Sequence, residues 1–150
     1  MRSFSIKLAL PLLLTLTACN RDPKQMYTIP PEYQHDWVIE AYDCQNGAAP
    51  VEGADGLEVM VPASGVVLHP GARVPTRDSY QQISLDGSVT SIGSSEVETG
   101  IGVEMVQKGV VPVPCNYSYI LLNKAVTDAQ LLQEIQAACQ RCESSIAAGL

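Results

Sequence analysis

Hydrophobic and polar residues alternate most regularly between residues 97 and 106. One side of an extended chain would carry Val97, Thr99, Ile101, Val103 and Met105, and the other would carry Glu96, Glu98, Gly100, Gly102 and Glu104. A period of two residues is typical of a β-strand with one buried and one solvated face. We therefore expect a strand over residues 97–106, with its apolar side in the core and its glutamates in solvent.

Several shorter segments also favour strands, because they are apolar or rich in β-branched and aromatic residues. They lie at residues 37–42, 57–61, 65–69 and 116–122. Residues 80–85 and 88–92 flank Asp86-Gly87. This pair is typical of a tight hairpin turn, since it accepts positive φ at low cost. Together these segments predict a small antiparallel sheet of about five or six strands.

The pattern changes to a helical period near the C-terminus. Apolar residues recur there at spacings of three and four, at Leu131, Leu132, Ile135, Ala138, Cys139, Cys142 and Ile146. Thr127 and Gln130 fit a capping box, in which each side chain binds the backbone of the other residue. We expect a helix over residues 128–147 that covers one sheet face. The predicted fold is therefore a single α+β domain over residues 37–150.

The first 18 residues have the features of a secretory signal peptide. Arg2 and Lys7 precede an apolar stretch over residues 8–16, which is about half the roughly 20 residues that a membrane-spanning helix needs. The following Leu16-Thr17-Ala18-Cys19 resembles the lipobox of bacterial lipoproteins. The resemblance implies diacylglycerol on the Cys19 thiol, cleavage after Ala18, and acylation of the new amino group by a fatty acid such as palmitate.

Asn20 follows the predicted lipidated cysteine. In enteric bacteria an aspartate at this place favours retention in the inner membrane, so Asn20 implies sorting to the outer membrane, facing the periplasm. Residues 19–36 contain three prolines and are expected to form an extended tether between the lipid and the domain. The alternative is that Tyr27, Ile29 and Tyr33 bind a partner or fold back on the domain.

Four further cysteines, Cys44, Cys115, Cys139 and Cys142, are an even number in an oxidising compartment and predict two disulfides. Distances counted along the last strand and the helix favour Cys115–Cys142 with Cys44–Cys139. The alternative is Cys44–Cys115 with a local Cys139–Cys142 bridge. Redox catalysis is not expected, since the C-x-x-C lies far from the helix N-terminus. No second ligand pair for zinc is recognisable.

The 150-residue chain contains 9 basic and 16 acidic residues. Removal of the signal peptide with Arg2 and Lys7 leaves 7 basic residues against the same 16 acidic ones, a formal charge of −9. This charge argues against nucleic acid as a partner and suits a basic protein. The candidate contact residues are Glu52, Asp55, Glu58, Glu96, Glu98 and Glu104.

Recognisable catalytic motifs are absent from the sequence: it has no nucleophile elbow, phosphate loop, zinc-protease helix or calcium loop. His69 is expected at a strand end in contact with solvent. We therefore expect neither an enzyme nor a metal or cofactor. The expected function is a protein-interaction module, anchored in the outer membrane by its lipid, which serves an unidentified envelope protein as an accessory subunit of a secretion, conjugation or pilus assembly. The alternative is an immunity protein or inhibitor that binds a basic periplasmic protein.

Overall fold

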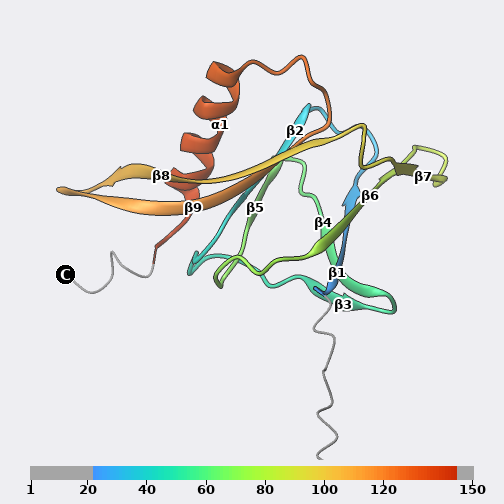
Figure 1. The fold of residues 1–150 in the computed structure, drawn as a ribbon, viewed down its shortest axis with the longest axis horizontal. Coiled ribbons are helices and arrows are strands. Elements are labelled where there is room, and N and C mark those ends of the chain that lie inside the picture. The colour runs from blue at the N-terminus through green and yellow to red at the C-terminus, as the bar shows by residue number, and fades with distance from the viewer. Residues whose placement is uncertain (1–21, 145–150) are drawn as a thin grey trace, which may run out of the picture.

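The computed structural model describes residues 22–144, which form two β-sheets and one helix (Figure 1). The elements are β1 (Lys24–Ile29), β2 (Trp37–Ala41), β3 (Val51–Gly53), β4 (Gly56–Met60), β5 (Val66–Leu68), β6 (Arg77–Ile83), β7 (Val89–Ile92), β8 (Glu98–Lys108), β9 (Val111–Leu121) and α1 (Asp128–Arg141). The predicted signal peptide and the lipobox residues Leu16–Cys19 lie outside the described residues.

The α+β class and the covering C-terminal helix are confirmed, but the sheet differs from the single antiparallel one that was expected. The strands form one sheet in the order β3-β4-β1-β6-β7 and a second in the order β5-β2-β9-β8. Both sheets are mixed. Strand β1 runs parallel to β4 and β6, and β2 runs parallel to β5, whereas the other neighbouring strands are antiparallel. The short apolar segments predicted the strands correctly. The hydrophobic pattern of a segment does not, however, show which other strand pairs with it.

Residues 24–36 do not form the expected tether. Lys24–Ile29 is the central strand of the five-stranded sheet, and Tyr27 and Ile29 are almost fully buried. The Tyr33 hydroxyl donates a hydrogen bond to the Trp37 carbonyl. The alternative, that these apolar residues fold back on the domain, is confirmed, because their burial against the second sheet outweighs the local preference of the prolines for an extended linker.

Helix α1 begins as predicted and ends earlier. The Thr127 side chain accepts from the Gln130 N–H, and the Gln130 side chain accepts from the Thr127 N–H, which completes the capping box. The helix was expected to reach residue 147, but it ends at Arg141, and Cys142 is a cap with extended backbone. Beyond the cap, Ser144 forms a β-bridge with Cys44. Residues 145–147 of the predicted helix lie outside the described residues.

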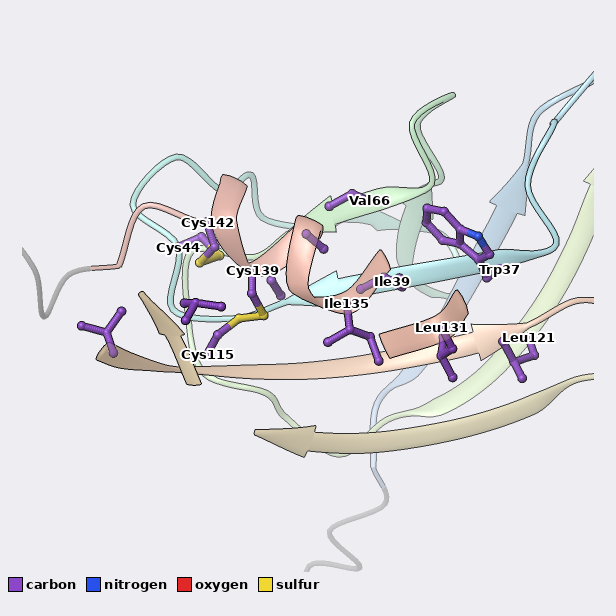
Figure 2. Packing of buried hydrophobic residues seen from close by; sticks show 14 residues of the cluster. Trp37, Ile39, Cys44, Val66, Cys115, Leu121, Leu131, Ile135, Cys139 and Cys142 are labelled. Carbon is purple, nitrogen blue, oxygen red and sulfur yellow. A yellow bond between two sulfur atoms is a disulfide. The ribbon is translucent and has the colours of Figure 1, made fainter. Parts of the chain in front are cut away.

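Two hydrophobic cores result from this arrangement. The first lies between α1 and the four-stranded sheet and includes Trp37, Ile39 and Ile135 (Figure 2). The second lies between the two sheets and includes Tyr27 and Val38. Strand β2 contributes to both cores, because successive side chains of a strand point to opposite faces. This explains why residues 37–42 are apolar almost throughout.

The two disulfides connect Cys44 to Cys142 and Cys115 to Cys139. Both connectivities predicted from the sequence, the favoured one and its alternative, are therefore wrong. Cys139 lies on the buried side of α1 above β9, whereas Cys142 has left the helix and lies beside the segment that follows β2 (Figure 2). Distances counted along an uninterrupted helix could not predict this, because the chain turns away from the helix axis at Cys142.

Candidate interaction surface

Strands β8 and β9 form a long hairpin that projects beyond α1 (Figure 1). The strands pair over 11 residues each, from Glu98 opposite Leu121 to Lys108 opposite Val111. Gly109 has a φ of 74° in the two-residue connection between them. Positive φ at this place is what a tight hairpin turn requires. On the face of β9 away from α1, Ser118 and Ile120 are buried, whereas Pro114 and Asn116 nearer the turn are exposed.

The two faces of β8 are exchanged relative to the expectation from the sequence. Gly100 and Gly102 lie on the face toward α1, where the rings of Tyr119 and Tyr117 from β9 cover them. Both tyrosines pack against the first core. Because successive side chains alternate between faces, Ile101, Val103 and Met105 point to the face away from α1, where they are exposed. The expectation that the apolar side of residues 97–106 faces the core is wrong for Ile101 and its apolar neighbours.

The exposed residues Ile101, Val103 and Met105 form what we call the apolar stripe. Their side chains are 65%, 58% and 56% exposed. The residues opposite them on β9 are Ser118, Asn116 and Pro114. No residue on this face of β8 is charged between Thr99 and Gln107.

The outer edge of β8 has no strand beside it within residues 22–144, since β8 is the last strand of its sheet. An unpaired edge offers backbone N–H and C=O groups to another chain, and natural proteins usually protect such edges with charges or prolines. The uncharged apolar stripe beside this edge is therefore the best candidate in the described chain for a protein contact.

The six acidic residues selected from the sequence fall into two groups on different sheets. Glu52 and Glu58 lie on β3 and β4, and Asp55 lies in the turn between them. Glu98 begins β8 and is exposed. Glu96, just before β8, accepts a hydrogen bond from the Gly93 N–H at 2.7 Å. The fold therefore does not place all six acidic residues on one contact surface.

The sixth acidic residue, Glu104, is bound to the helix. Its carboxylate accepts a hydrogen bond from Gln136 of α1 at 3.1 Å. By register, Glu104 lies opposite Cys115 on the face of β8 that α1 covers. Its position is thus on the opposite face from the apolar stripe.

A buried carboxylate outside the residues predicted from the sequence connects the two sheets. Glu40 of β2 is 2% exposed. Its Oε1 accepts from the Tyr27 hydroxyl at 2.9 Å and from Ser118 Oγ at 2.8 Å, and its Oε2 lies 2.6 Å from His69 Nε2. Tyr27 belongs to the five-stranded sheet and Ser118 to the four-stranded sheet. The only signal in the sequence was a charged residue within an apolar run.

His69 is buried, in contrast to the expectation that it contacts solvent. The chain around it is held by backbone hydrogen bonds from the His69 N–H to the Ala41 carbonyl and from the Cys44 N–H to the His69 carbonyl. The imidazole stacks on the Tyr42 ring with centroids 4.8 Å apart. These contacts turn the ring toward Glu40.

The hydrogen bonds of Glu40 keep it ionised. Burial by itself would raise its pKa, but the hydrogen bond and charge of His69, with the bonds from Ser118 and Tyr27, outweigh burial and hold the pKa below its ordinary value. Burial and the nearby Glu40 charge raise the pKa of Tyr27, so the phenol keeps its proton and donates a hydrogen bond to the carboxylate. Ser118 donates to Glu40 and not to the imidazole, so this cluster lacks the serine–histidine contact of an activated nucleophile.

A cavity of about 250 Å³ lies beside this cluster, and its lining includes Glu40, Arg73, Asp78 and Thr99. Both carboxylate oxygens of Glu40 are already occupied by protein donors. Among residues 22–144, His, Cys, Asp and Glu side chains are nowhere grouped in threes that could bind a metal ion. We interpret the cluster as a polar connection that fixes the two sheets relative to one another.

Within the described part of the chain, no helix combines the length and apolar character needed to cross a bilayer. No protein-family model and no curated protein matches the sequence. A crystal structure of a provisionally described lipoprotein from Bacillus anthracis has a similar fold, with a TM-score of 0.60 and 14% sequence identity. The match covers 81% of this chain and 94% of that chain. At this identity the similarity establishes a shared fold only.

Proposed function

We propose that this protein is a bacterial lipoprotein whose domain binds another envelope protein, as an accessory subunit of a secretion, conjugation or pilus assembly. The lipid on Cys19 anchors it in the outer membrane, and the domain faces the periplasm. The lipobox Leu16-Thr17-Ala18-Cys19 supports the anchor, and so does the fold shared with a chain described as a lipoprotein. The observation that carries the binding function is the apolar stripe beside the free edge of β8.

The partner contributes an extended segment that adds to β8 as a further strand. Main-chain hydrogen bonds along the edge would supply affinity, and alternate side chains of the segment would contact the apolar stripe. Burying the exposed parts of Ile101, Val103 and Met105 stabilises such a complex by about 1–2 kcal/mol per residue before the cost of association. Basic residues beside the added strand would complement Glu96 and Glu98 and the formal charge of −9.

The second candidate function is an immunity protein or inhibitor that binds a basic periplasmic protein. The observation that favours it is the separate acidic group Glu52, Asp55 and Glu58 on the β3–β4 hairpin. Charge reversal at Glu52 and Glu58 would then weaken binding in a salt-dependent way, because exposed charges are screened by salt. Substitution in the apolar stripe would leave such binding unchanged.

Photo-crosslinking in cells that produce the full-length chain tests the proposal. Benzoylphenylalanine replaces Val103 in one variant and Leu132, an exposed apolar residue of α1, in the matched control. We expect a discrete adduct with one envelope protein from position 103, no adduct from position 132, and loss of the first adduct after Ile101→Lys. The proposal is refuted by the absence of an adduct from position 103, by equal adducts from both positions, or by an adduct with a second copy of the chain.

A further inference from the structure

Residues that are bound to the five-stranded sheet lie very close in the sequence to the predicted lipid on Cys19. Arg77, at the start of β6, donates from its backbone N–H to the Pro23 carbonyl at 2.9 Å and from Nε to the Asp22 carbonyl at 3.0 Å. Lys24 then begins β1 directly opposite Arg77. Asp22, only three residues after Cys19, is therefore held against the start of β6.

Three residues give the anchor little reach. A fully extended chain spans at most about 3.3–3.6 Å per residue, or about 10 Å from Cys19 to Asp22. The polar headgroup region of one leaflet is about 5–8 Å thick, the difference between a bilayer of 40–45 Å and its 30 Å hydrocarbon core divided over two faces. Crossing the headgroups therefore uses most of the length of chain between Cys19 and Asp22. If Cys19 is lipidated, a gap of tens of ångströms between the domain and the membrane is excluded.

We infer that one end of the five-stranded sheet rests directly on the lipid headgroups, an inference that rests on the proposed lipidation of Cys19. This membrane-facing end consists of the level starts of the parallel strands β1, β4 and β6, at Lys24, Gly56 and Arg77, with the turn that contains Asp55. Positive and negative side chains are mixed there. The orientation of the domain on the membrane is thus determined by the short connection between Cys19 and Asp22, and not by a patch of like charges.

This orientation separates the two candidate surfaces. The β3–β4 hairpin belongs to the membrane-facing end, so Glu52, Asp55 and Glu58 lie close to the headgroups. In the view of Figure 1 the start of β1 lies at the opposite side of the molecule from α1, with hairpin β8–β9 between them and extending to one side. The apolar stripe therefore stays accessible to a protein in the periplasm, whereas the acidic hairpin faces lipid.

Two native lysines allow the orientation to be measured. Lys24 lies at the membrane-facing end and is exposed in the isolated chain. Lys124 is exposed in the connection before α1, next to Asn123, whose N–H donates to the Asp36 carbonyl beyond the far end of β1. Because β1 spans about 17 Å at about 3.3 Å per residue, the two lysines report on opposite ends of the sheet.

The experiment uses the full-length lipidated protein in vesicles of phosphatidylcholine and phosphatidylglycerol, whose headgroups have no primary amine, with a bulky amine-reactive polyethylene glycol as the probe. The matched control carries a Gly/Ser insertion of about 24 residues between Asn20 and Arg21, which adds about 27 Å of average reach. We expect the labelling of Lys24 relative to Lys124 to rise by roughly fivefold or more in the control, because the longer linker releases the sheet end from the headgroups.

Equal labelling ratios in the two proteins would overturn the inference. Incorporation of clickable palmitate, abolished by Cys19→Ser, is measured on the same samples. Palmitate incorporation with equal labelling ratios rejects the orientation while the lipoprotein assignment stands. Absence of palmitate from the wild type rejects the proposed anchor and the orientation together.

Discussion

Removal of the Glu40 carboxylate is expected to be one of the most destabilising single changes in the domain. Glu40→Ala leaves the Tyr27 and Ser118 hydroxyls and the His69 ring buried without their acceptor. Loss of one partner from a buried charged cluster costs about 3–5 kcal/mol, since the remaining polar groups stay desolvated. We expect the free energy of unfolding to fall by about that amount.

Glu40→Gln separates the loss of charge from the loss of hydrogen bonds. The amide oxygen still accepts from Tyr27 and Ser118, and the amide nitrogen donates to His69 Nε2 when the ring carries its proton on Nδ1. Replacing charge-assisted bonds of about 1.5–3 kcal/mol by neutral ones of about 0.5–1.5 kcal/mol predicts a loss of about 1–2 kcal/mol. The glutamine variant should therefore lie clearly between the wild type and the alanine variant.

Urea unfolding of the oxidised protein, followed by the fluorescence of the single Trp37 and by far-ultraviolet circular dichroism, measures both changes. Trp37 is buried in the core beneath α1, so its emission shifts to the red when the domain unfolds. Glu98→Ala on exposed β8 is the control and should change stability by no more than about 0.5 kcal/mol. A loss below about 1 kcal/mol for Glu40→Ala, or equal losses for the alanine and glutamine variants, would refute the reasoning.

The difference in stability between the wild type and Glu40→Gln is also expected to depend on pH. The pKa of Glu40 in the folded protein lies below its ordinary value of 4.5. Its ionised form therefore contributes stability that is fully present above pH 4.5 and is lost as the pH falls toward the folded pKa. Glutamine does not titrate, so the stability difference between wild type and Glu40→Gln should shrink below that pH. A difference that stays constant or grows on acidification would contradict the assignment.

Two further predictions concern the disulfides and the hairpin. Replacing Cys44 and Cys142 by serine opens a link between residues 98 apart and should cost about 4.7 kcal/mol, against about 3.4 kcal/mol for Cys115 and Cys139, which are 24 apart. Urea midpoints of the two double variants check the order, and non-reducing peptide mapping checks the pairing. Gly100→Val should cost about 1–3 kcal/mol, because the added side chain overlaps the tyrosine ring from β9. An unchanged thermal midpoint would show that the ring does not cover this glycine.

The sequence by itself determined those features whose causes lie within a few residues. The capping box at Thr127 and Gln130 set the start of α1, and the spacing of Leu131, Ile135, Ala138 and Cys139 set the side that is buried. Leu132, which was expected on the same side, is exposed. Asp86-Gly87 marked the connection between β6 and β7, where Gly87 has a φ of 82°. Period-two alternation identified β8 as a strand. Each of these signals depends on backbone geometry and near neighbours, which a linear pattern records.

The tertiary structure decided which face of β8 is buried, which cysteines pair, and where β1 lies. Tyr119 covers Gly100 from another strand, and Cys44 meets Cys142 across 98 residues. Tyr27 reaches Glu40 from the other sheet. Such choices depend on competition between distant segments for the same buried space, and both faces of an alternating strand can satisfy the local pattern. The apolar stripe became recognisable as a surface only once the tyrosines of β9 had occupied the opposite face.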